Sequence, residues 1–405
     1  MGANYVRRQA QNRSKSSLQI HAMTTRVNIN PEILVWSRRV AGLVPVNAAR
    51  KIGTTPERLD AWENGDALPT VIQLRKIGKV YHKPAAFFYL ETPPPLPPEI
   101  PDFRRLPDAF IEKSPELLSQ IQIARSKKET AIQLYEQLGH TPPDVDLSIQ
   151  KTEGTTIIAN KLRDYLSVSL ETQMGWSDKY EGLRGWIEAL EAKGVMVFQF
   201  SGVSTTEVRG FALSERPVPV IAINGSDSPL GRIFTVLHEF AHIAANEGGL
   251  CDLHNNHEGY NYIEPFFNQI AGEILVPSFS LQAQEQVRVN NTEEWEDRDL
   301  SLLAKRFTVG REVILRRLLS LGLTTERFYR MKRGQYLDQY KRMKKAKGFL
   351  APHRKALRDS GKAFTHLLFN AYYNNVLSAR DFSKHLGNVK QKHIRTIGHE
   401  LGIGY

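Results

Sequence analysis

The chain has 405 residues, of which 41% are hydrophobic and 24% charged, which is enough for roughly two to four domains with buried cores. No apolar run reaches the about 18 residues of a membrane-spanning helix, and no apolar leader begins the chain, so neither membrane insertion nor secretion is expected. The single cysteine, Cys251, excludes an internal disulfide framework and fits the reducing cytoplasm, where we expect the protein.

The net charge of +11 is concentrated at the two ends of the chain. The first 30 residues hold 5 Lys and Arg and no acidic residue, whereas residues 331–405 hold 16 Lys and Arg against 4 Asp and Glu. Residues 1–30 are polar and lack hydrophobic periodicity, which predicts a basic, disordered tail.

Five short helices are predicted after this tail, because apolar residues recur at helical spacing between Gly and Asn-Gly breaks. The expected helices are 31–41, 46–52, 56–62, 70–81 and 83–90.

The same segment carries a recognisable set of positions, namely Leu34, Arg38, Gly42, Leu43, Ala48, Ala49, Ile52, Gly53, Trp62, Glu63, Asn64, Gly65, Pro69 and Leu74. With these residues it resembles the lambda-repressor-like (XRE) helix-turn-helix family. The resemblance implies that helix 56–62 would enter the major groove of duplex DNA.

Three basic residues of this segment, Arg50, Lys51 and Arg58, could reach DNA, whereas Glu57 and Asp60 on the same helix as Arg58 would repel phosphate. Domains of this kind also serve as protein-docking modules, so DNA binding and protein binding both stay open.

A proline-rich stretch at 93–106 predicts a semi-rigid spacer. A long amphipathic helix then runs from Ser114 to Gly139 and is expected to pack on the core that follows. Helices at 155–166 and 180–193 come next.

Three runs rich in β-branched residues, 194–201, 208–213 and 218–224, predict a small sheet. We expect the last of them to be an edge strand, to which an extended peptide could add by backbone hydrogen bonds.

A helix is predicted from the N-cap residue Ser228 to the pair Gly248-Gly249. Its apolar stripe is formed by Ile233, Val236, Leu237, Phe240, Ala241 and Ala244. His238 and His242 lie four residues apart beside this stripe, and Glu239 follows the first of them. This is the H-E-x-x-H arrangement, in which two imidazoles hold Zn²⁺ and the glutamate acts as general base.

A catalytic zinc site needs a third protein ligand and one open position. The metzincin spacing fails, because Ala245 and Gly248 stand where it requires Gly and His. A following helix, 264–276, offers Glu264 as the third ligand, and Asn268 one turn later could orient a metal-bound imidazole.

The polar loop between these two helices leaves alternatives open. His254 and His257 are the other candidate ligands, and a donor to the transition state could come from either of them, from Tyr260 or from Tyr262.

The two helices share a pattern made by Phe234, Thr235, His238, Glu239, His242, Glu264, Asn268, Ala271, Leu275 and Pro277. By this pattern, the stretch from about residue 195 to 277 resembles the ImmA/IrrE family of zinc metallopeptidases; it departs only at Ile270, where that family has Phe.

The expected fold class is α+β, with a zincin-like domain made of a small sheet and the H-E-x-x-H helix. We divide the chain into the tail 1–30, a helix-turn-helix domain 31–92, the linker 93–106, a metallopeptidase domain 107–300 and a basic helical region 301–405.

The resemblance implies a cytoplasmic zinc endopeptidase that cleaves a transcriptional repressor or an antitoxin-like protein in a stress or mobile-element circuit. A DNA-binding regulator whose zinc site is structural or sensory is the alternative function. Residues 331–405, with aromatic side chains among the basic ones, suit a solvated helical surface better than a nucleic-acid site.

Overall fold

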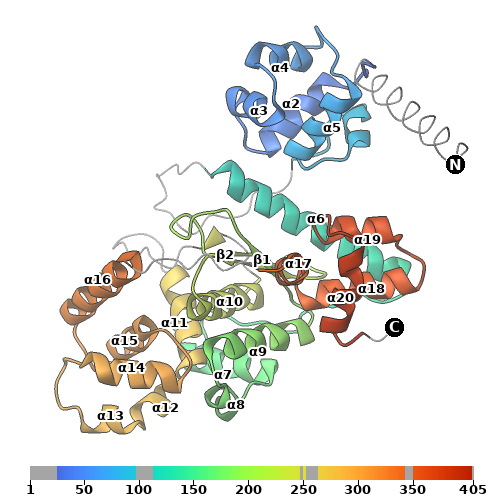
Figure 1. Cartoon of the computed structure of the whole chain (residues 1–405). Helices are drawn as coiled ribbons and strands as arrows, with labels where there is room; N and C mark the ends of the chain where they lie inside the picture. Colours follow the sequence, from blue (N-terminus) through green and yellow to red (C-terminus); the bar gives the residue numbers. More distant parts are fainter. Residues whose placement is uncertain (1–24, 97–112, 247–249, 252–262, 343–349, 404–405) are drawn as a thin grey trace, which may run out of the picture. The chain divides into compact units, whose positions relative to one another are not determined.

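The computed structural model of the chain describes residues 25–96, 113–246, 250–251, 263–342 and 350–403 (Figure 1). It divides into two compact units: Met1–Glu99 with Ile111–Ile123, and Ile100–Phe110 with Ala124–Tyr405. Both are dominated by helices, and the second contains a small sheet, which confirms the α+β class. Among the helices of these ranges, none is long and apolar enough to cross a membrane.

The first unit is helical throughout. Its elements are α2 (Pro31–Val40), α3 (Pro45–Ile52), α4 (Pro56–Glu63), α5 (Val71–Val80), the 3-10 helix η1 (Ala85–Tyr89) and the first turns of α6 (Pro115–Gln137). Asn30 caps α2 and Thr55 caps α4, while Thr70 and Gln73 form a reciprocal capping box on α5. Residues 25–30 pack with this unit, because Arg26 bridges to Thr70 and Ile29 is buried, and residues 1–24 of the predicted tail lie outside the described chain.

The start of α6 packs closely on this unit. Gly42 has φ +64°, and a Cβ there would lie 2.0 Å from Leu118 Cδ1, so only glycine fits both the backbone and the contact. Lys51 pairs with Glu116 at 3.0 Å, and His82 Nε2 lies 2.8 Å from Ser119 Oγ.

The second unit contains the sheet and the remaining helices. Before and within the sheet come α7 (Thr155–Leu166), α8 (Leu170–Gly175), α9 (Lys179–Ala192), β1 (Met196–Phe200), β2 (Gly210–Leu213), β3 (Val220–Asn224), α10 (Pro229–Ala244) and β4 (Leu250–Cys251). After it come α11 (Ile263–Leu275), α12 (Ser278–Gln282), α13 (Glu285–Val289), α14 (Asp297–Arg306), α15 (Arg311–Ser320), α16 (Glu326–Arg342), α17 (Pro352–Ser360), α18 (Lys362–Tyr373), α19 (Ala379–His385) and α20 (Lys392–Glu400).

The strand order in the sheet is β1-β3-β2-β4, with β1 parallel to β3 and the other pairs antiparallel. The prediction that 218–224 forms an edge strand is therefore wrong, because β3 is hydrogen-bonded on both sides. All five residues of β3 are buried, as expected of a central strand covered on both faces. In the described chain the outer strands are β1 and β4, and α17 packs against β1.

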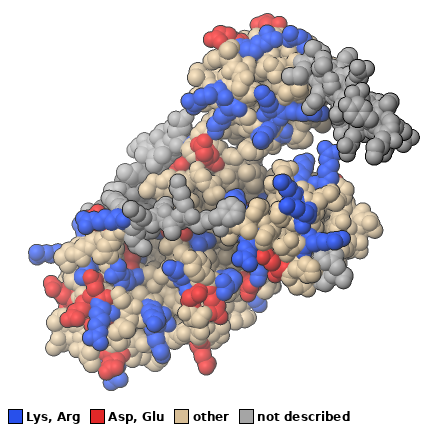
Figure 2. Space-filling model, viewed as in Figure 1, with Lys and Arg blue, Asp and Glu red and all other residues tan. Residues whose placement is uncertain are grey.

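One continuous core joins the sheet to α7, α9, α10, α11, α14 and α15. Helix α10 passes through its middle, with contacts to β2, β3, α9 and α11. Around α14 to α16, basic and acidic side chains alternate on the visible surface rather than forming one basic area (Figure 2).

Candidate metal centre

Helix α10 is held in place by its sequence. Ser228 accepts a hydrogen bond from Gly231 N at 3.0 Å and Pro229 occupies the first helical position, so the helix starts where the sequence predicts. Every residue from Ile233 to Ala244 is buried. The H-E-x-x-H segment therefore lies on a fixed element inside the core rather than at a mobile surface.

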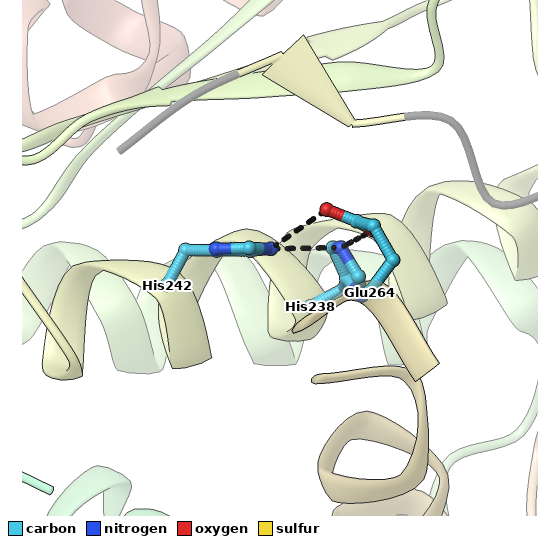
Figure 3. A group of neighbouring side chains, drawn as sticks. All are labelled: His238, His242 and Glu264. Carbon is cyan, nitrogen blue, oxygen red and sulfur yellow. Dashed lines mark hydrogen bonds and ion pairs between the residues drawn. The ribbon is translucent and has the colours of Figure 1, made fainter. Parts of the chain in front are cut away.

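Helix α11 brings the third side chain. Glu264 lies in its first turn and is 5% exposed, and Asn268, one turn later, is 4% exposed. The helix packs against α10 and α7. Figure 3 shows the carboxylate of Glu264 turned towards the imidazoles of His238 and His242, which project from one side of α10.

The three side chains converge through their ligand atoms. His238 Nε2 and His242 Nε2 are 3.1 Å apart, and Glu264 places Oε2 at 3.1 Å from His238 Nε2 and Oε1 at 3.4 Å from His242 Nε2. Within the described chain they form the one group of three or more His, Cys, Asp or Glu with mutual spacing suited to a metal ion.

These distances fit a tetrahedral ion. With metal–ligand bonds of about 2.0–2.1 Å, neighbouring ligand atoms of a tetrahedral zinc site are about 3.3–3.4 Å apart. Two nitrogens and one carboxylate oxygen, all buried, also form the donor set of zinc hydrolases that keep a fourth position open. The residues present therefore fit a zinc ion.

The electrostatics of the group favour a cation. Burial alone raises the pKa of Glu264, but the two imidazoles outweigh it, and together they lower that pKa to about 2. The carboxylate is thus ionised, in a place where an uncompensated charge would be costly. His238 Nδ1 and Asn268 Oδ1 are both buried without a hydrogen-bond partner, so the predicted orienting bond from Asn268 to an imidazole stays a prediction.

Glu239 is buried beside the three ligand residues but does not belong to their cluster. Gly210 of β2 lies close to its carboxylate, since an added Cβ there would lie 3.2 Å from Glu239 Oε1. A carboxylate next to the ligands yet outside their group suits proton transfer rather than metal ligation.

The alternative ligands and transition-state donors predicted from the sequence are not described by the structure. His254, His257, Tyr260 and Tyr262 lie outside the described residues, so the alternative ligands and donors stay untested. The sequence reasoning missed Phe267, whose ring centroid is 3.8 Å from that of His242. Its position three residues after Glu264, on the same helical face, was the available signal.

The candidate DNA-binding residues lie on α3 and α4 of the first unit. Arg50 is exposed and hydrogen-bonded to Asn47, and Lys51 is paired with Glu116. Arg58 is in the first turn of α4 and is half-buried. Whether any of them contacts DNA stays a prediction.

Two buried imidazoles from α10 and a buried carboxylate from α11, beside a small sheet, form a group that could hold a metal ion in the manner of zincin-like metallopeptidases. Residues 190–319 match the family model described as IrrE N-terminal-like domain, Peptidase_M78. The matched segment runs from the end of α9 to α15 and includes all three ligand residues, so it supports a metallopeptidase of the ImmA/IrrE type. No curated protein matches the chain.

Proposed function

We propose that the protein is a zinc-dependent endopeptidase with His238, His242 and Glu264 as the zinc ligands and Glu239 as the general base. The observation that carries this proposal is the convergence of the three side chains in a buried group next to Glu239: the two Nε2 atoms are 3.1 Å apart, and the two oxygens of Glu264 lie 3.1 Å and 3.4 Å from them.

Held by His238, His242 and Glu264, zinc would supply Lewis acidity and would lower the pKa of a water molecule towards neutral pH. Glu239 accepts the proton of the attacking water and delivers it to the nitrogen of the leaving amine as the peptide bond breaks. The carboxylate of Glu264 and the two imidazoles keep fixed positions during this transfer, because α10 and α11 pack against each other in the core.

The position of β4 supports a binding site for an extended peptide substrate. β4 pairs with β2 through Gly210 and Cys251, and Gly210 is the residue next to Glu239. We propose β4, in place of β3, as the strand to which an extended substrate adds by backbone hydrogen bonds.

For the substrate, the resemblance to ImmA/IrrE peptidases supports a repressor or an antitoxin-like protein of a stress or mobile-element circuit. The first unit would then bind DNA or dock the protein target. Its predicted DNA-facing charges are partly neutralised, since Lys51 is paired with Glu116 and Glu57 and Asp60 are exposed beside Arg58. Binding of the full chain to duplex DNA that weakens with added salt and with Arg58→Ala would support the DNA role.

The decisive test is Glu239→Gln, which keeps the side-chain shape but removes the base. We expect the variant to retain zinc and to hydrolyse peptide roughly two to four orders of magnitude more slowly, the usual contribution of a general base. The level of the target protein should stay high in cells that express the variant at the wild-type level. Equal target levels with the two proteins, under conditions where the wild type changes transcription, would instead favour a regulator with a structural or sensory zinc site.

A further inference from the structure

A cavity of about 270 Å³ lies beside the metal centre in the second unit. Its walls come from the first turns of α10 and α15, from α16 and from the residue before β2. The polar lining residues used below are Arg209, Asp227, Arg311, Glu312 and Arg316.

Phe234 is in contact with both the cavity and the candidate metal ligand His238. This side chain lines the cavity, and its ring stacks on His238 with centroids 6.4 Å apart and planes 25° from parallel. Residues 234 and 238 are about 6 Å apart along the helix axis at 1.5 Å per residue. An extended peptide advances about 3.3 Å per residue, so a peptide that runs along α10 would place a side chain in the cavity within about two residues of the bond at the metal. On the opposite wall, Arg209 directly precedes Gly210, the neighbour of Glu239.

The cavity is lined by more arginine side chains than carboxylates: Arg209, Arg311 and Arg316 against Asp227 and Glu312. Both carboxylates are already paired, Asp227 with Arg209 at 3.3 Å and Glu312 with Arg316 at 3.8 Å. Glu312 is shared further with Arg333 at 3.2 Å.

The hydrogen bond and the ring contact of Arg311 are both made with uncharged side chains. Its Nη2 donates to Gln339 Oε1 at 2.8 Å, and the guanidinium lies over the ring of Tyr336 at 4.3 Å from the centroid. Among the described residues it makes no ion pair with a carboxylate. These two contacts hold the guanidinium in place. Arg311 also interacts electrostatically with Asp297, but that carboxylate is paired directly with Lys332 at 3.0 Å, so the guanidinium can still donate to a planar carboxylate.

Apolar side chains complete the lining: Leu230, Phe234, Val313 and Leu337. An aliphatic stem that ends in a carboxylate would bury its methylene groups against these residues and pair its charge with Arg311. We propose that this cavity is a substrate subsite for an acidic side chain, Glu or Asp, within about two residues of the scissile bond, with Arg311 as its specificity-determining residue. This inference rests on the proposed peptidase function.

The test uses the full-length, zinc-loaded Glu239→Gln protein, which binds peptide without turnover. Random peptides displayed on phage are selected on it, and the selected sequences are synthesised with amidated C-termini. We expect Asp or Glu to be enriched at one position, and its replacement by Asn or Gln to weaken binding about tenfold or more, measured by fluorescence anisotropy.

Arg311→Gln added to this protein should weaken binding of the acidic peptide by the same factor. It should not change binding of the amide peptide, since the protein change and the peptide change remove the same interaction. Arg327→Gln, which alters an exposed arginine of α16 outside the cavity, is the matched control and should not change the binding of either peptide. No selected peptide, no acidic enrichment, an acid preference that survives Arg311→Gln, or binding that depends on a free C-terminal carboxylate would each overturn the proposal. Hydrolysis of the selected peptides by the wild type is measured separately, so the subsite and the peptidase function can fail independently.

Discussion

Gly210 of β2 lies close to α10, and Gly210→Ala should damage both stability and the proposed activity. A Cβ there would lie 2.5 Å from Thr235 Cγ2 and 3.1 Å from Ala222 O, as well as 3.2 Å from Glu239 Oε1. Unbonded carbon atoms rest at about 3.5–4.0 Å, so one of these groups must move. Thr235 cannot turn away easily, because it is β-branched and buried and its hydroxyl donates to Gly231 O at 3.0 Å.

The expected magnitude follows from two opposing terms. Overpacking a core in this way costs about 1–3 kcal/mol. Restricting the unfolded chain by a Gly→Ala change offsets about 0.4–1 kcal/mol, since Gly210 is not among the residues with positive φ. The steric term wins, and we expect a net loss of about 1–2 kcal/mol in the free energy of unfolding. Because Glu239 is one of the crowded groups, peptide hydrolysis should fall as well.

Urea denaturation of four proteins measures this effect: wild type, Gly210→Ala, Thr235→Ser and the double variant. Thr235→Ser removes the methyl group at 2.5 Å and keeps the hydroxyl. The stability loss caused by Gly210→Ala should therefore be much smaller in the Thr235→Ser background. A single variant as stable as the wild type, or a loss of the same size in both backgrounds, would refute this reasoning.

Three further changes test other parts of the second unit. Glu264→Ala should remove most of the bound zinc, because two imidazoles alone hold it weakly; near-stoichiometric zinc by elemental analysis would contradict the ligand assignment. Burial raises the pKa of Glu191 from 4.5 to about 7, so the stability it contributes is full below pH 4.5 and is lost as the pH rises through 7. Glu191→Gln should remove this pH dependence and exceed the wild type in stability above pH 7, and an unchanged slope of unfolding free energy against pH would contradict it. Arg317→Met leaves the buried Glu273 carboxylate without its cation and should cost about 3–5 kcal/mol in urea denaturation, whereas Arg317→Met with Glu273→Met should recover most of it; equal losses would exclude the pair as the cause.

The helices were largely predictable because their ends depend on local chemistry. Asn30, Thr70 and Ser228 cap their helices through their own side chains, and these interactions are within three residues of sequence. For the same reason the facing positions of His238 and His242 follow from helical spacing alone. Segment 83–90 differs, since only Ala85–Tyr89 is helical and it takes the 3-10 form.

Strand order depends on contacts that are distant in sequence, and there the sequence reasoning failed. The segment 218–224 was expected at an edge, whereas β3 lies between β1 and β2, because β1 pairs with β3 rather than with the next strand in the sequence. The apolar run Val220–Ile223 was the signal for a central strand, because an edge strand with one solvated face would alternate apolar and polar residues. Two-residue strands such as β4 have no periodicity to detect.

The burial of the candidate metal centre makes the H-E-x-x-H motif stronger support for a metal site than the sequence alone. Two histidines four apart on an apolar helix can also be core residues that pair with backbone groups. In this structure their Nε2 atoms face each other and an ionised carboxylate at 3.1–3.4 Å. A chance core pair would leave these groups desolvated with little to offset the cost, whereas a divalent cation would satisfy all three at once. The arrangement therefore favours the proposed metal site over packing alone.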